Sequence, residues 1–346
     1  MLQKYEDLKN NCLAVGSLPH KSTEEAINIV RQFYYDIPFC PQLPKLSKNE
    51  DMLLQYLENM PGIIINQNKA YFDKDMSNFS NEILKLNEAF TNKCNIDDYG
   101  LSDNFSKAFK GFIEIIKDTK PKYAKSQITG PYTLALSLKD KNGDIAYNNE
   151  TYRTIITKTL SLKALWQIKQ INKACKDTTP IIFIDEPTLS KTETIKDNEI
   201  AIDIIKQVSD TIQNNGAISA VHCCGDCNWS LLTKIGMDMI NFDAFVFAEK
   251  MENYAKELNV FLENGGKIVW GIVPTLDKNA LKETSTKEIE QKLNIAKSYL
   301  VKAGINPDLI DNNSLVSTSC GCGSLSVQLA EKAIKITREL SDKLKG

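Results

Sequence analysis

The sequence predicts an α/β protein that folds as a single (β/α)8 TIM barrel. Eight short apolar segments recur along its 346 residues, and most of them are separated by stretches whose apolar residues have helical spacing. The segments are apolar on both faces, which is typical of parallel strands that are covered by helices. Eight such units in a chain of this length favour a closed barrel over an open sheet.

The predicted strands mostly end at turn residues or at residues with chemically active side chains. In chain order they span residues 12–15, 37–40, 123–129, 180–184, 217–221, 239–242, 267–270 and 315–317. Prolines at positions 38 and 41 break the second of these segments. The C-terminal ends of the strands are where barrel enzymes carry their active sites.

Helices are predicted between the strands. Ser22 and Glu25 have capping-box spacing at the start of the first helix. A long helix is predicted at about 152–174, and amphipathic stripes predict further helices at about 200–212 and 329–340.

One stretch, at about 61–117, does not follow this alternation. Residues 61–72 predict a β-hairpin with its turn at 66–69, and a helical segment is expected from about 78 to 117. No internal repeat, low-complexity tract or linker divides the chain. We therefore expect one domain over residues 1–346, with this hairpin and helical segment inserted near its N-terminus.

The composition excludes several classes of protein. The chain is 42% hydrophobic and 25% charged, with a net charge of −2, and it has no long basic run that would favour nucleic-acid binding. No stretch approaches the ~18 uninterrupted apolar residues of a membrane span. Residues 1–11 lack the apolar centre of a signal peptide, so we expect a cytoplasmic protein. Nine cysteines in a reducing compartment do not indicate a disulfide framework.

Two cysteine-bearing stretches, about a hundred residues apart, follow predicted strands. Side chains alternate along a strand, so His222 and Cys224 point the same way and offer an imidazole and a thiolate on one face. Cys320 or Cys322 is positioned to supply a third ligand. One alternative is a closed structural site in which Cys227 or Cys322 is a fourth ligand, and another is that the cysteines only pack in the core.

A zinc site with three protein ligands keeps a fourth position open. A substrate thiol that binds there loses its proton to the metal, although a free thiol has a pKa of about 8.5. Two protein thiolates and a neutral imidazole leave the centre roughly uncharged, so a third thiolate stays nucleophilic. The predicted cofactor is therefore Zn²⁺, and the predicted chemistry is thiol activation.

Two further pairs of residues follow predicted strands. Asp185 and Glu186 are suited to fixing an ammonium group, with a helix or turn cap as the alternative role for Asp185. Gly16 and Ser17 offer backbone N–H groups to a substrate carboxylate, although an ordinary turn explains them equally well.

Two single residues complete the candidates. His20 is one of only two histidines and is a candidate catalytic group, although a lone histidine in a loop is more often solvated or structural. Asp243 is the other catalytic candidate. It is a weak fourth metal ligand, a partner of the His222 ring, or an ordinary cap at the end of a strand.

These motifs resemble the family of cobalamin-independent methionine synthase, within the larger group that includes uroporphyrinogen decarboxylase and methylcobamide:coenzyme M methyltransferase. The resemblance covers nearly the whole chain and is carried by residues 15–20, 184–187, 222–224 and 319–325. His222 and Cys224 look like the family's His-x-Cys zinc pair, and Cys320 looks like its distal cysteine.

The resemblance also implies roles for the remaining candidates. Gly16 and Ser17 would hold the carboxylate of an amino acid, and Asp185 its amine. Asp243 falls where methionine synthases carry a glutamate ligand to zinc, and its shorter side chain places direct coordination in question.

The activity implied is zinc-dependent transfer of a methyl group to a thiol, with homocysteine as the acceptor and methionine as the product. Folate-using members have two barrels and this sequence predicts one, so we expect a methylcorrinoid as the donor. No Asp-x-His-x-x-Gly corrinoid loop surrounds either histidine, which implies a separate corrinoid protein as partner. The alternatives are a coenzyme M-type methyltransferase and a non-catalytic barrel that binds zinc or a corrinoid partner. A decarboxylase is disfavoured, because that chemistry uses no zinc.

Overall fold

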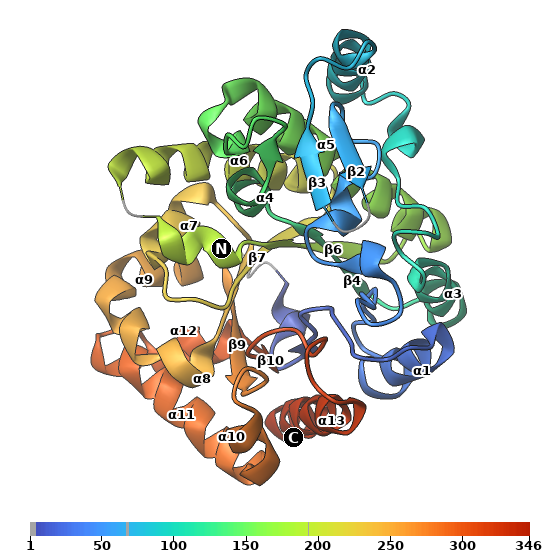
Figure 1. The fold of residues 1–346 in the computed structure, drawn as a ribbon. Helices are drawn as coiled ribbons and strands as arrows, with labels where there is room; N and C mark the ends of the chain where they lie inside the picture. Colours follow the sequence, from blue (N-terminus) through green and yellow to red (C-terminus); the bar gives the residue numbers. More distant parts are fainter. Residues whose placement is uncertain (1–4, 67–68, 193) are drawn as a thin grey trace.

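In the computed structural model, which describes residues 5–66, 69–192 and 194–346, a curled parallel sheet forms the centre of the molecule (Figure 1). Within these residues the sheet has seven strands in the order β1-β10-β9-β8-β7-β6-β4. Their bounds are β1 (Cys12–Leu13), β4 (Tyr123–Thr129), β6 (Thr179–Asp185), β7 (Ile218–Cys223), β8 (Met239–Phe242), β9 (Lys267–Val273) and β10 (Ser314–Thr318). The predicted α/β class with a TIM-barrel-like sheet is confirmed.

The segment 38–42 lies between the two edge strands, β1 and β4. On one side, the Cys40 N–H donates to the Lys125 carbonyl at 2.9 Å. On the other side, the Gln42 N–H donates to the Gly16 carbonyl at 3.1 Å. The two prolines of this part of the chain cannot donate to a ladder, so it forms isolated bridges where a strand was predicted. The segment thereby takes the place of the eighth strand.

Helices surround the sheet as a ring (Figure 1). They include α1 (Thr23–Phe33), α3 (Phe109–Thr119), α5 (Glu150–Ala174), α6 (Ile195–Gln213), α7 (Trp229–Ile235), α9 (Ala255–Glu263), α11 (Thr286–Lys302) and α13 (Val327–Lys345). Shorter helices in the connections are α4 (Pro131–Ser137), α8 (Ala244–Phe247), α10 (Lys278–Glu283) and α12 (Pro307–Asn312). The predicted start of α1 is confirmed, because the Ser22 hydroxyl accepts the Glu25 N–H at 3.3 Å. None of the helices in the described ranges has the length and apolar character that a membrane crossing requires.

The N-terminal part carries the predicted hairpin. β2 (Ile63–Asn66) and β3 (Lys69–Phe72) pair antiparallel, and the turn between them, at 67–68, lies outside the described residues. A third strand that was not predicted, β5 (Lys139–Asp140), adds to β3 in parallel. Helix α2 (Phe79–Asn92) follows the hairpin, whereas α3 contacts α1 and α5 in the ring around the barrel.

An apolar layer lies inside the curled sheet. Its buried members come from successive strands and include Leu13, Tyr123, Phe183, Ala220, Met239, Val269 and Leu315. Because side chains alternate along a strand, the residue two positions later faces the same interior. On β6, β7 and β8 these residues are Asp185, His222 and Asn241. The apolar layer is therefore the floor of a polar layer at the C-terminal ends of the strands.

Glu186 connects the ends of three neighbouring strands. Its backbone N–H donates to the His222 carbonyl at 2.8 Å. Its carboxylate accepts the N–H groups of Tyr132 and Thr133, at 2.9 and 2.8 Å, and so caps the N-terminus of α4. Gly130 leaves room for this contact, since a Cβ at that position would lie 2.0 Å from the Glu186 carboxyl carbon.

This packing predicts a coupled effect of two substitutions. Gly130 has a φ of −72°, so alanine is not strained there, and Gly130→Ala acts through the clash with Glu186. We expect it to lower the free energy of unfolding by about 1–3 kcal/mol, the usual cost of overpacking. In a Glu186→Ala background the same change should cost under about 0.5 kcal/mol, and urea unfolding of the four proteins measures the difference. Equal costs in both backgrounds would contradict the proposed contact.

Candidate metal centre

The structure brings His222, Cys224 and Cys320 together at the C-terminal ends of β7 and β10. Their ligand atoms all lie within 4.8 Å of one another, with the histidine buried and the cysteines partly exposed. Of the two cysteines between which the sequence left a choice, Cys320 is the one that belongs to this group. Cys322 lies outside the group, and burial raises the pKa of its thiol to about 12.

The His222 ring is oriented by Asn241, its neighbour in register on β8. The Asn241 amide nitrogen donates to the Val269 carbonyl at 2.9 Å and to the Ser317 hydroxyl at 2.8 Å. Its amide oxygen must therefore face the histidine, and it lies 2.6 Å from Nδ1. An amide oxygen only accepts, so Nδ1 carries a proton and Nε2 is the nitrogen left for a metal.

The donor set fits zinc. The Nε2 atom of His222 is buried and has no hydrogen-bond partner within the described ranges. An imidazole nitrogen and two cysteine sulfurs are ligands that catalytic zinc sites use. Among the residues that the structure describes, three groups and not four make up the cluster, so a tetrahedral ion held by them would have one position free.

Without a metal, one of the two sulfurs in the cluster is already a thiolate. A hydrogen bond from the Cys320 thiol, assisted by His222 and opposed by burial, lowers the pKa of Cys224 to about 4. The same hydrogen bond raises the pKa of Cys320. Burial lowers the pKa of His222, but the Cys224 thiolate outweighs burial and raises it to about 9. A metal ion would replace the proton on Nε2 and the proton on Cys320.

The loop after β1, which contains Ser17, packs against the loop after β10, which contains Cys320. The Ser17 hydroxyl accepts the Gly323 N–H at 3.2 Å, and the Ser17 carbonyl accepts the Cys322 N–H at 2.9 Å. A Cβ at Gly321 would lie 2.1 Å from the Ser17 hydroxyl oxygen. The glycines of the Cys-Gly-Cys-Gly stretch therefore let Ser17 approach the metal loop.

Asp185 lies in register with His222 on the neighbouring strand. One of its carboxylate oxygens, Oδ1, is buried and has no hydrogen-bond partner among the described residues. Burial raises the pKa of Asp185, while the positive charge of Lys125 opposes that shift. Glu186 differs from Asp185, because both of its oxygens are engaged at the start of α4 and burial raises its pKa to about 7.

His20 and Asp243 do not join the three-residue cluster. His20 is 1% exposed, and its Nε2 lies 3.6 Å from a carboxylate oxygen of Glu331 on α13. Asp243 caps α8 by accepting the Val246 N–H at 3.2 Å. Burial, with a contribution from the Cys224 thiolate, raises the pKa of Asp243 to about 6, so the carboxyl group is electrostatically linked to the cluster.

Of the three roles that the sequence offered for Asp243, the structure shows the cap at the end of the strand, and the hydrogen-bond partner of the His222 ring is Asn241. The signal for this was present in the sequence. Asn241 precedes Asp243 by two residues, so it faces the same side of β8. Only the pairing of β7 with β8 places it opposite His222, and that register was not predicted.

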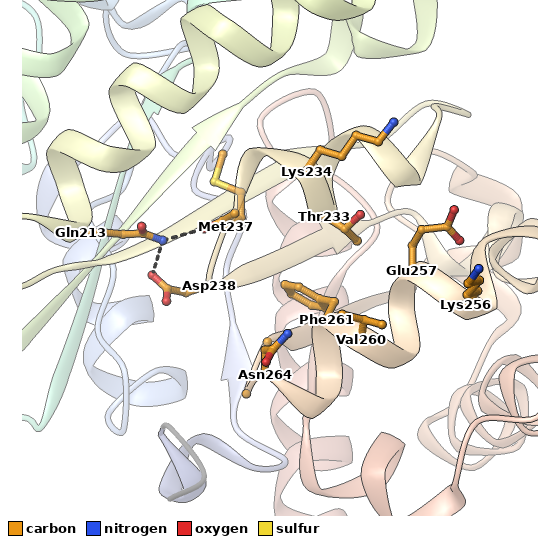
Figure 2. Close-up of a pocket in the computed structure, with 13 residues that line it drawn as sticks. Gln213, Thr233, Lys234, Met237, Asp238, Lys256, Glu257, Val260, Phe261 and Asn264 are labelled. Atoms are coloured by element: carbon orange, nitrogen blue, oxygen red, sulfur yellow. Dashed lines mark hydrogen bonds between the residues drawn. The ribbon is translucent and has the colours of Figure 1, made fainter. Parts of the chain in front are cut away.

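A cavity of about 560 Å³ lies at the other end of the barrel. It is bounded by α7, α9 and the residues that precede β8 and β9. In its wall, the Gln213 side-chain amide donates a hydrogen bond of 3.1 Å to the Asp238 carboxylate (Figure 2). None of the residues predicted for the site lines it. This cavity is therefore separate from the cluster of His222, Cys224 and Cys320.

Comparisons with known proteins find the fold but no family. No protein-family model matches the chain, and no curated protein matches it by sequence. A solved structure of a methyltransferase from Methanosarcina mazei is similar, with a TM-score of 0.52 and 13% identity over 96% of this chain and 94% of that one. At this identity the likeness shows the fold alone: this chain has the TIM-barrel-like architecture of a known methyltransferase.

Proposed function

We propose that this protein is a zinc-dependent methyltransferase that moves a methyl group onto a thiol, with homocysteine as the acceptor. The observation that carries the proposal is the meeting of His222, Cys224 and Cys320 at one end of the barrel. The fold shared with a methyltransferase supports the same reaction class.

His222, Cys224 and Cys320 would hold the zinc ion, which would supply a Lewis acid for the deprotonation of a substrate thiol. The protein's own contribution is to hold the ligands still. Asn241 fixes the His222 ring, and Glu186 ties the end of β7 to β6 and α4. Fixed ligands keep the acceptor sulfur in one place while it attacks the methyl carbon.

Asp185 supports an amino-acid acceptor. A buried carboxylate oxygen without a partner costs about 1–3 kcal/mol or more, and an ammonium group would remove that cost. Asp185 lies beside His222 on the adjacent strand, and adjacent strands are about 4.8 Å apart. The amine and the sulfur of one small amino acid can therefore reach both strands. Gly16 and Ser17, beside the Cys320 loop, are our proposed site for its carboxylate.

A methylated corrinoid on a separate protein is the donor that we propose. In such a transfer the acceptor thiolate supplies the electron pair of the new S–C bond, and the electrons of the broken Co–C bond stay on cobalt. Apolar side chains support a docking face, because Leu46, Val246 and Leu276 follow the C-terminal ends of the barrel and are 37%, 60% and 56% exposed.

The metal centre predicts one zinc per chain. His222→Ala, Cys224→Ala and Cys320→Ala should each reduce the zinc content to a small fraction, measured by elemental analysis after gel filtration, with the far-UV circular dichroism retained. Cys322→Ala is the matched control and should keep its zinc. Loss of zinc from Cys322→Ala, with full content in Cys320→Ala, would refute the assignment of ligands.

The acceptor site predicts a selective effect at Asp185. Asp185→Asn keeps the shape of the side chain and removes the charge, so the dissociation constant for homocysteine should rise about ten- to a hundredfold, or about 1.5–3 kcal/mol. The zinc content should stay unchanged. Asp226→Asn, at an exposed aspartate in the loop after Cys224, is the control. Unchanged binding in Asp185→Asn would favour an acceptor without an amine, such as coenzyme M.

The donor assignment predicts which methyl compound supports turnover. A methyl group on a folate nitrogen is a poor electrophile until that nitrogen is protonated, whereas methylcobalamin carries an activated methyl group. Zinc-loaded protein with homocysteine should therefore form methionine from methylcobalamin and not from methyltetrahydrofolate, with Cys224→Ala as the blank. Turnover with the folate donor alone would exclude the corrinoid proposal, and turnover with neither donor would favour a binding protein.

A further inference from the structure

We infer that Thr275, which follows β9, is a positioning residue that holds Cys320 in place as a metal ligand. The inference rests on the proposed function, because it takes Cys320 to be one of the three ligands. Thr275 was not among the residues that the sequence singled out. It is 1% exposed, and its side chain bonds to the backbone on both sides of the Cys320 side chain.

The Thr275 hydroxyl forms hydrogen bonds with both backbone polar groups of Cys320. The Cys320 N–H donates to the Thr275 hydroxyl oxygen at 2.9 Å, and the Thr275 hydroxyl donates to the Cys320 carbonyl, also at 2.9 Å. The Ser319 hydroxyl lies 3.2 Å from the same oxygen and accepts the Thr275 N–H at 3.1 Å. One side chain thus fixes both peptide groups that flank the Cys320 α-carbon.

Counting protons assigns every bond in this network. A hydroxyl has one donor and two acceptor positions. The Cys320 carbonyl can only accept, so the single proton of the Thr275 hydroxyl goes to it. The Ser319 proton therefore points to the Thr275 oxygen, which accepts from Ser319 and from the Cys320 N–H. All hydrogen-bonding positions of the Thr275 hydroxyl are used within the Cys320 turn.

The turn itself needs this support, because the strand that leads into it is irregular. The register between β9 and β10 shifts between Ser317 and Thr318, as in a β-bulge. Bulges redirect the side chains that follow them and interrupt the regular ladder. Thr318 adds a second hydroxyl bond to the Cys320 carbonyl at 2.8 Å. Side-chain hydroxyls therefore replace the ladder where the chain turns Cys320 toward His222 and Cys224.

The test compares Thr275→Val with Thr275→Ser. Valine keeps the volume and removes the hydroxyl, whereas serine keeps the hydroxyl. Loss of a group that orients a metal ligand typically weakens metal binding about ten- to a hundredfold. We expect that rise in the zinc dissociation constant for Thr275→Val, measured by competition with a chromophoric chelator, and a value near wild type for Thr275→Ser. With Co²⁺ as a probe, the sulfur-to-metal charge-transfer band should weaken in the valine variant only.

Thr233→Val is the matched control, because it removes a hydroxyl that bonds to a backbone carbonyl at 3.0 Å in α7, beside the cavity at the other end of the barrel. It should leave zinc binding unchanged. If Thr275→Val binds zinc as tightly as wild type while Cys320→Ala does not, the inference is overturned and the metal centre stands. If wild-type protein binds no zinc, the metal centre and the inference both fall.

Discussion

The hydrogen bond between His222 and Asn241 is the constraint on which the candidate metal centre depends. Asn241 cannot rotate its amide, because a backbone carbonyl on β9 and a hydroxyl on β10 take its two N–H groups. The orientation of the His222 ring on β7 is therefore set by β9 and β10, which lie beyond its neighbouring strand β8. If the amide were reversed, its nitrogen would meet Nδ1, and the neutral ring would then have to carry its proton on Nε2 and could not offer that atom to a metal.

The curled sheet explains why residues so far apart in sequence can lie together. Ser17 and the stretch 321–323 are at opposite ends of the chain, yet β1 and β10 are paired neighbours. The loops that follow them must share a small space, and glycine at 321 is required because Ser17 occupies the volume of a Cβ. The spacing Cys-Gly-Cys-Gly thus reflects packing against the first loop as much as it reflects metal chemistry.

The sequence was sufficient for features that depend on local pattern and insufficient for those that depend on strand pairing. Apolar runs located the strands, and the alternation rule placed His222 and Cys224 on one face. The bridging segment 38–42 was harder, because its hydrogen bonds come from both neighbours and no local periodicity reports them. Asn241 and Thr275 act across strands, so their partners could be found only once the register of β7, β8, β9 and β10 was known.

The positions of Cys223, Cys227 and Cys322 bear on whether a bound metal would be structural or catalytic. Cys223 alternates with its neighbours along β7 and faces away from the cluster, where a hydrogen bond from the Cys227 thiol lowers the pKa of Cys223. Cys227 is thereby occupied outside the barrel interior, and Cys322 is buried in the core. Neither residue belongs to the group of ligands in the described part of the chain. A closed site of one histidine and three cysteines would need Cys227 or Cys322 to leave its packed position, so the geometry favours a site that would leave the fourth position of the ion open to a substrate.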